Sequence, residues 1–254
     1  MSFIDTKILI AGYGLPAEFA INLLFGLGCT PDHLKVLTHE IDARNSGLIN
    51  CCLLREVEFI VYDRANVDTE RWIREFSPDL ILSLHFREYL PETILNIVDG
   101  RAINLHPSLL PQYKGAFSVP WVIVNNEKYT GFTYHYMTSR FDSGNILLQD
   151  QILISEGETA LSLFHKQVVK ALFRLEDVIA RALAGDEGVP QDGDGTYYPR
   201  KLPNDGYIDS SWSDEQVARF IRAMYFPPLL GARMMINHNI RYISTFFEYK
   251  KLVQ

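Results

Sequence analysis

The first 106 residues alternate between two kinds of segment, and this alternation constrains the fold more than any other feature of the chain. Short apolar segments of the strand type recur at 7–12, 33–39, 57–62, 79–86 and 101–106. Segments of the helix type lie between several of them, at 15–28, 68–76 and 91–98. Strands that alternate with helices form parallel sheets with helices on both faces. We therefore predict an α/β protein with a Rossmann-like, mostly parallel, doubly wound sheet.

The pattern changes after residue 106. We expect a helix over 116–127 interrupted near Pro120, strands at 129–138 and 145–154 joined by an irregular loop at 139–144, and a long helix from Thr159 to Ala184. The glycine-rich stretch 185–195 is typical of a linker. It precedes a short helix at 213–224 and a β-hairpin within 233–249, with its turn at Asn237 to Asn239. These segments predict a core domain over 1–184 and a small C-terminal helix and β-hairpin extension over 185–254.

Composition excludes several classes of protein. The 254 residues are 47% hydrophobic, but no apolar run approaches the roughly 18 residues that a membrane-spanning helix needs. The net charge of −7 argues against a large nucleic-acid partner, because such partners need a basic face. The three cysteines show no metal-ligand spacing and fit a reducing compartment, and the first residues do not resemble a signal peptide. We expect a cytoplasmic protein with no metal, no membrane contact and no nucleic-acid partner.

The clearest candidates for chemistry lie at the end of the strand 101–106. Residues two apart in a strand point to the same face, so Asn104 and His106 should share one face just before a turn stiffened by Pro107 and Pro111. In an open α/β sheet, ligands bind outside the carboxyl ends of the strands. A polar pair satisfied within a turn explains the same residues, so the local pattern leaves both interpretations open.

A second candidate is Gly12-Tyr13-Gly14, which follows the first strand and resembles the beginning of a dinucleotide fingerprint. Position 17 is alanine where a third glycine would stand. Close packing of the strand explains the two glycines as well as phosphate binding at the next helix does.

Two motifs together resemble the formyltransferases that use 10-formyltetrahydrofolate. Asn104-Leu105-His106-Pro107-Ser108-Leu109-Leu110-Pro111 matches the Asn-x-His-x-Ser-Leu-Leu-Pro signature of that family. Asp142-Ser143-Gly144-Asn145-Ile146 matches its Asp-x-Gly-x-Ile segment at the right distance. The resemblance covers roughly residues 7 to 250, and it implies that 1–184 is a formyltransferase catalytic core.

The C-terminal segment narrows the resemblance to one branch. "YYPRKLPNDGYIDSSWSDEQVARFIRAMYFPP" (197–228) resembles the segment shared by methionyl-tRNA formyltransferases and nucleotide-sugar N-formyltransferases. The tRNA enzymes add a barrel domain, for which too few residues remain, so the nucleotide-sugar branch fits best. "AGYGLPAEF", "SLHFREYLP" and "FIRAMYFPP" look most like enzymes that formylate GDP-perosamine for lipopolysaccharide O-antigen.

The resemblance implies roles for three residues. A sugar amino group would attack the formyl carbon of the folate, and Asn104 would stabilise the oxyanion that forms. His106 would transfer protons and polarise the same centre. Asp142 would hold His106 in the needed tautomer and relay a proton to the leaving folate nitrogen.

It also implies where the two substrates bind. The folate would be held mainly by backbone groups of two loops, which contain Glu88, Tyr89, Leu90, Thr138, Ser139, Arg140 and Phe141. The nucleotide sugar would meet Gly12, Tyr13, Gly14, Arg44, Asn45, Lys114 and Tyr225. Each group has a bland alternative: Tyr89 and Leu90 as core residues, Arg44 as a solvated charge, and Tyr225 in aromatic packing. Ala116 stands where some relatives carry a folate-contacting arginine, which Lys114 replaces only in part.

Other functions and the oligomeric state stay open at this level. Formylation of a dTDP- or UDP-linked sugar or of methionyl-tRNA is the nearest alternative. A formate-releasing hydrolase of similar core would carry an extra domain in front, and a non-catalytic folate- or sugar-nucleotide-binding protein would not need Asn104, His106 and Asp142. The apolar tail 233–249 predicts a homodimer, because a lone hairpin needs a covering surface, although the chain's own sheet could supply it.

Overall fold

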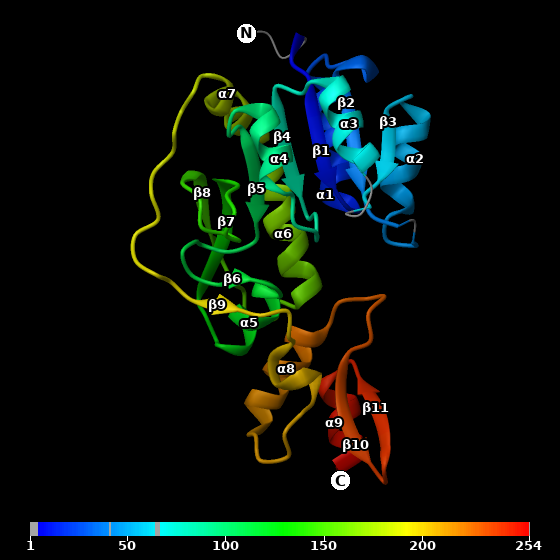
Figure 1. Ribbon diagram of the computed structural model, residues 1–254. Coiled ribbons are helices and arrows are strands. Elements are labelled where there is room, and N and C mark those ends of the chain that lie inside the picture. The colour runs from blue at the N-terminus through cyan, green and yellow to red at the C-terminus, as the bar shows by residue number, and fades with distance from the viewer. Residues whose placement is uncertain (1–4, 41, 64–66, 254) are drawn as a thin grey trace. The chain divides into compact units, whose positions relative to one another are not determined.

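The computed structural model describes residues 5–40, 42–63 and 67–253 of the chain. Its helices and strands are β1 (Ile8–Gly12), α1 (Leu15–Gly26), β2 (Leu34–Thr38), α2 (Ser46–Leu54), β3 (Glu58–Val61), α3 (Val67–Phe76), β4 (Leu80–Leu84), α4 (Glu92–Leu95), β5 (Ala102–His106), β6 (Lys114–Gly115), α5 (Ser118–Val124), β7 (Tyr129–Tyr136), β8 (Ile146–Leu153), α6 (Ala160–Leu172), α7 (Leu175–Leu183), β9 (Tyr197–Tyr198), α8 (Asp214–Met224), β10 (Ala232–Ile236), β11 (Asn239–Ile243) and α9 (Phe246–Val253), shown in Figure 1. No helix within these ranges is long and apolar enough to cross a membrane.

The chain forms two compact units that interleave in sequence. The first comprises Met1–His106, Thr133–Gln149 and Lys170–Gln191. The second comprises Pro107–Phe132, Asp150–Val169 and Asp192–Gln254. Each unit has its own internal contacts, and the division expected at residue 184 stays a prediction.

A seven-stranded sheet has the order β3-β2-β1-β4-β5-β7-β8. The pairs β2–β3, β1–β2, β1–β4 and β4–β5 are parallel, and β5–β7 is antiparallel. β1 and β4 are buried along their whole length, as expected for strands covered on both faces. On one face, Leu9 and Ile81 pack with Ile73 of α3 and Ile94 of α4. The predicted α/β, mostly parallel, doubly wound sheet is confirmed.

One crossover helix was absent from our expectation. α2 connects β2 to β3, two parallel strands that a short turn cannot join. Its sequence, SGLINCCLL, lacks a clear apolar stripe, because Leu53 and Leu54 are exposed while Cys51 and Cys52 are buried. Without that periodicity the segment gives little sign of a helix.

Two other helices differ from their predicted form. The long helix expected over 159–184 divides into α6 and α7 at Phe173 and Arg174. There the Ala171 carbonyl accepts a hydrogen bond from the Tyr134 hydroxyl at 2.9 Å and another from the Arg174 N–H at 2.9 Å, so it leaves the helical ladder. The interruption expected near Pro120 is wrong. Pro120 is the third residue of α5, where its missing N–H has no intrahelical partner to lose.

The C-terminal part of the second unit contains the expected short helix, α8, and the hairpin β10–β11. Asn237 and His238 form the hairpin turn with left-handed φ angles of 48° and 61°, which suit a two-residue turn. The hairpin ends at Ile243, however, and the expected strand up to Tyr249 is instead α9. The Thr245 hydroxyl accepts the Glu248 N–H at 3.1 Å and thus caps this helix.

Candidate active site

Asn104 is tied to both strands that flank β5. It lies opposite Ser83 of β4 and opposite His135 of β7 in the register of the sheet. The Ser83 hydroxyl donates to Asn104 Oδ1 at 2.7 Å, and Asn104 Nδ2 lies 3.1 Å from His135 Nε2. The amide orientation is therefore set by one donor and one acceptor in the same layer of the sheet.

His106 meets Asp142 at the carboxyl end of β5. His106 Nδ1 lies 3.4 Å from Asp142 Oδ1, and the same oxygen lies 3.4 Å from His135 Nε2. The side chains of His106, His135 and Asp142 are 5%, 3% and 9% exposed, so they interact largely without solvent screening. The structure thus brings together Asn104, His106 and Asp142, which the sequence placed about forty residues apart.

His135, which was not among the predicted site residues, contacts Asn104 and lies near Asp142. Its Nδ1 lies 2.9 Å from the Tyr136 carbonyl, an acceptor, so Nδ1 carries the proton of the neutral ring. Nε2 then accepts from the Asn104 amide. Ser83 was also missed. The signal for both residues is their register opposite Asn104, which becomes visible only once the strands are paired.

A polar cluster lies in the loops after β1 and β2. The Tyr13 hydroxyl donates to the Asp42 carboxylate, at 2.7 and 2.6 Å from its two oxygens, and Arg44 forms an ion pair with Asp42 at 3.1 Å. The hydrogen bond from Tyr13, followed by those from Arg44, lowers the pKa of Asp42 to about 2. Burial and the same hydrogen bond raise the pKa of Tyr13. Asp42 was not among the predicted site residues, but it binds Tyr13 and Arg44, which were.

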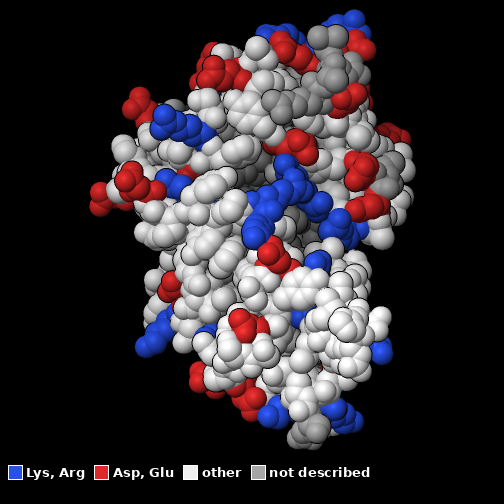
Figure 2. All heavy atoms as spheres, turned by 60° about the horizontal axis from the view of Figure 1, so that its bottom comes forward, with Lys and Arg blue, Asp and Glu red and all other residues white. Residues whose placement is uncertain are grey.

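Arg87, in the loop after β4, adds a second cation to this cluster. Its guanidinium lies 3.8 Å from the centroid of the Tyr13 ring, and its backbone N–H donates to His39 Nε2 at 2.9 Å. His39 in turn stacks on Phe86, with ring centroids 4.6 Å apart. Arg44 is thus paired with Asp42, whereas the Arg87 guanidinium lies over the Tyr13 ring. Figure 2 shows basic side chains gathered on one face of the molecule.

The two glycines and Asn45 have roles in packing. A Cβ on Gly12 would lie 2.5 Å from Ala17 Cβ, and a Cβ on Gly14, whose φ is 61°, would lie 2.9 Å from the Arg44 carbonyl. Asn45 is fully buried, and its Oδ1 accepts the Gly14 N–H at 3.0 Å. The packing alternative therefore accounts for the two glycines, and the contact of all three residues with a phosphate stays a prediction.

The loops expected to hold folate meet through two aromatic rings. Tyr89, after β4, packs edge-on against Phe141, after β7, with centroids 5.8 Å apart. Phe141 is 60% exposed, whereas the Leu90 side chain is 1% exposed and belongs to the apolar core. Glu88, Ser139 and Arg140 are at the surface, and the Thr138 hydroxyl donates to the Arg140 carbonyl at 3.0 Å.

Lys114 and Tyr225 belong to the second unit. Lys114 lies in β6, and its Nζ donates to the Asp194 carbonyl at 3.2 Å. Tyr225 follows α8 as its C-cap residue, and its carbonyl accepts the Leu161 N–H at 3.1 Å. The neighbouring Phe226 packs edge-on against Phe164, which matches the aromatic-packing alternative for this pair.

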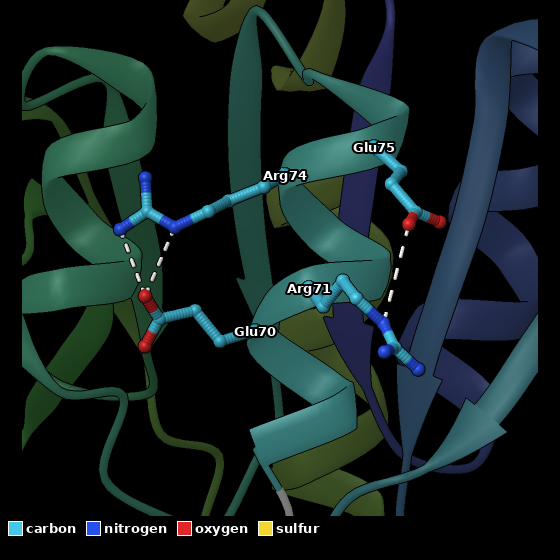
Figure 3. Close-up of a pocket in the computed structure, with 4 residues that line it drawn as sticks. All are labelled: Glu70, Arg71, Arg74 and Glu75. Atoms are coloured by element: carbon cyan, nitrogen blue, oxygen red, sulfur yellow. Dashed lines mark hydrogen bonds and ion pairs between the residues drawn. The ribbon is translucent and has the colours of Figure 1, made fainter.

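A shallow hollow on α3 has a simpler explanation than ligand binding. It is lined by Glu70, Arg71, Arg74 and Glu75, which Figure 3 shows as two ion pairs along the helix. Arg74 and Glu70 lie 2.8 Å apart, and the Arg71–Glu75 pair is longer at 4.0 Å. Such exposed i,i+4 pairs stabilise a helix slightly. Among the residues that the structure describes, no group of three His, Cys, Asp or Glu side chains could hold a metal ion.

Comparison with known proteins defines the class. Residues 53–172 match the family model described as formyl transferase. The GDP-perosamine N-formyltransferase of Brucella melitensis biotype 1 is 44% identical over 250 residues, which cover 98% of this chain and 96% of the relative. The chain therefore belongs to the formyltransferase family.

Solved structures show the same fold. The sugar N-formyltransferase from Shewanella sp FDAARGOS_354 superposes with a TM-score of 0.76 at 22% identity, over 94% of this chain and 96% of that one. The N-formyltransferase from Helicobacter canadensis, solved with folinic acid and dTDP-3-aminofucose, gives a TM-score of 0.75 at 22% identity, over 92% and 85% of the two chains. At this level of identity the likeness concerns the fold alone.

Proposed function

We propose that the protein transfers a formyl group from 10-formyltetrahydrofolate to the amino group of a nucleotide-linked amino-dideoxy sugar. GDP-perosamine is the proposed acceptor, and the product would enter lipopolysaccharide O-antigen. The observation that carries the reaction type is the convergence of Asn104, His106 and Asp142 at the end of β5. The identity of 44% to a GDP-perosamine N-formyltransferase, over nearly the whole chain, supports the choice of sugar.

The geometry suits transfer of an acyl carbon to an amine. An amide nitrogen carries two hydrogens, so Asn104 Nδ2 can keep one on His135 and donate the other to an oxygen that gains negative charge. Because His106 Nδ1 faces Asp142, Nε2 is the ring nitrogen that would meet the reacting amine and accept its proton. The carboxylate of Asp142 stabilises the imidazolium that results.

The residues present fit a folate. The Tyr89–Phe141 pair forms a partly exposed aromatic surface. The loop of residues 137–145, which contains Phe141, offers backbone N–H and carbonyl groups. A flat, hydrogen-bonding pterin suits this combination of apolar surface and polar backbone. When bound, 10-formyltetrahydrofolate supplies an electrophilic formyl carbon. The residues of this chain would orient that carbon toward Asn104 and His106 and exclude water from it.

The polar cluster of Tyr13, Asp42, Arg44 and Arg87 fits the diphosphate of a nucleotide sugar. Arg44 and Arg87 outnumber Asp42 as charges, and guanidinium groups bind phosphate oxygens through paired hydrogen bonds. Asp42 and the Tyr13 ring hold the two cations in place before a ligand arrives. The cluster would thus bind the substrate without taking part in proton transfer.

A mass-spectrometric assay tests this function. Purified protein is incubated with 10-formyltetrahydrofolate and, separately, with GDP-, dTDP- and UDP-linked amino sugars and methionyl-tRNA. We expect GDP-perosamine to gain the mass of one CO unit fastest. A gain on another nucleotide sugar alone would correct the acceptor, and no gain on any nucleotide sugar would refute the function.

We further propose a homodimer that uses the hairpin and α9. Met235, Ile240 and Tyr242 of the hairpin are 55%, 43% and 41% exposed, and Phe247 of α9 is 69% exposed. Exposed apolar groups of this size commonly mark an interface, and a two-fold axis would cover both copies at once.

Finally, we propose a cytoplasmic location. Cys29, Cys51 and Cys52 are buried free thiols, and burial raises the pKa of each. Free thiols of this kind are typical of reducing compartments.

A further inference from the structure

The Asp142 carboxylate depends on an irregular loop for its position. Residues 137–145 connect β7 to β8, and Asp142 itself has a left-handed φ of 51°. Gly144 passes so close to β7 that a Cβ there would lie 1.9 Å from the Tyr136 carbonyl oxygen. A loop of this shape needs support from neighbouring segments, because its own backbone conformation is unfavourable.

A segment that the sequence marks as a linker supplies that support. We call residues 185–191 the strap. Within the first unit, Val189 and Ile146 exchange two backbone hydrogen bonds of 2.8 Å, and Asn145 Nδ2 donates to the Glu187 carbonyl at 2.9 Å. The Tyr136 hydroxyl donates to the Asp186 carbonyl. The strap therefore runs beside both ends of the loop, at the end of β7 and the start of β8.

Gln191, the last residue of the strap, contacts the loop at the catalytic position. Its Nε2 donates to the Asp142 carbonyl at 2.8 Å and to the Gly144 carbonyl at 2.9 Å. Both hydrogens of the amide are thus used on the two carbonyls that flank Ser143. Gln191 Oε1 is buried without a partner among the described residues, so the amide is oriented by the two carbonyls alone. The reversed orientation would set an oxygen against two oxygens.

We propose that Gln191 is a positioning residue for Asp142. By binding the carbonyls on either side of Ser143, it holds the loop so that Asp142 Oδ1 stays 3.4 Å from His106 Nδ1. Gln191 acts through Asp142 and touches neither reacting group. The proposal deepens the proposed function and rests on it, because it assumes that Asp142 acts on His106 during formyl transfer.

The test compares Gln191→Leu with wild type. Leucine has a similar volume and cannot donate, so the loop loses both hydrogen bonds. We expect kcat to fall by about tenfold to a hundredfold, as misplacement near an ångström does, while KM for both substrates stays within about twofold. In an NMR titration, the His106 ring should also become protonated at a lower pH than in wild type, because a displaced carboxylate stabilises the imidazolium less.

Two further variants keep the test decisive. Glu187→Gln is the matched control. The Glu187 side chain is exposed, and Asn145 binds the backbone carbonyl of Glu187, which the substitution keeps. It should retain wild-type kcat and His106 titration. Gln191→Asn keeps a donor that is one methylene too short to reach both carbonyls, and it replaces Gln191→Leu if the latter does not fold. We expect it to show the same changes in smaller measure.

The outcomes separate this proposal from the proposed function. Wild-type kcat per folded molecule and an unchanged His106 titration in both Gln191 variants would overturn the positioning role, even if either variant were less stable. If wild type formylated no nucleotide sugar, the proposed function would fail. The NMR titration would still test the link between Gln191 and His106, and a shift to lower pH would support it.

Discussion

Removing the His85 ring should reduce the stability that the protein loses in mild acid. His85 follows β4 directly, and its ring packs edge-on against Tyr13, with centroids 6.0 Å apart. Burial, followed by the positive charges of Arg87 and Arg44 and by His39, lowers the pKa of His85 to about 3. The folded protein therefore keeps this ring neutral at every pH from 7.5 down to about 5.

The sign and size of the effect follow from this depressed pKa. Because an unfolded histidine titrates near 6.5, the unfolded chain takes up a proton that the folded chain refuses, so stability is present above that pH and is lost as the pH falls toward 3. Between pH 7.5 and pH 5 the loss from this one residue amounts to about 2 kcal/mol in the free energy of unfolding. We expect His85→Asn to remove that loss, since asparagine tolerates the left-handed φ of 61° found here.

Urea unfolding at the two pH values measures the difference directly. His238→Asn is the matched control, because His238 also has a φ of 61° but is exposed at the hairpin turn. The control should keep the wild-type dependence on pH, while His85→Asn should lose about 2 kcal/mol of it. An equal drop in stability for wild type and His85→Asn would refute the reasoning.

Three further expectations concern the ligands and the assembly. Arg87→Met should raise KM for the nucleotide sugar about tenfold or more with little change in kcat, because a binding contact is removed, whereas Arg71→Met on the exposed face of α3 should change neither. A non-reactive folate analogue at about 100 times its Kd, with nucleotide sugar present, should raise the melting temperature by about 5 °C, and no shift would count against the folate site. Light scattering at micromolar concentration should show a particle of twice 29.1 kDa, and Phe247→Glu should shift it to the monomer. A wild-type particle of 29.1 kDa would refute the dimer.

Much of the fold could be predicted because strands and helices each give the sequence a characteristic hydrophobic pattern. The parallel strands and the hairpin turn at Asn237 both carry local signals, and the structure contains them. α2 lacks an apolar stripe, yet its presence follows from the parallel pairing of β2 and β3, which demands a crossover. α9 also carries a local signal, because Thr245 and Glu248 have the spacing of a helix cap.

The candidate site was predictable only in part, for a physical reason. Asn104 and His106 are neighbours in sequence, and the family resemblance added Asp142. His135 contacts Asn104 from the neighbouring strand, 31 positions away in sequence. Gln191 contacts Asp142 from the strap, 49 positions away. Such contacts depend on register and on loop conformation, which no local pattern encodes. Asn45 illustrates the converse: this polar residue in a promising loop is fully buried and accepts the Gly14 N–H, and its contact with a substrate stays a prediction.

The rate of formyl transfer by His106→Ala and Asn104→Ala, measured against wild type with 10-formyltetrahydrofolate and GDP-perosamine, tests the central claim most directly. Loss of a single oxyanion donor typically lowers kcat by about 10²–10³, and loss of the proton-transferring group should cost at least as much. Circular dichroism should show that both variants are folded, because many other buried apolar residues stabilise the sheet that contains positions 104 and 106. We predict that kcat falls by about 100-fold or more in each variant. Turnover close to wild type in either folded variant would contradict the assignment of this site.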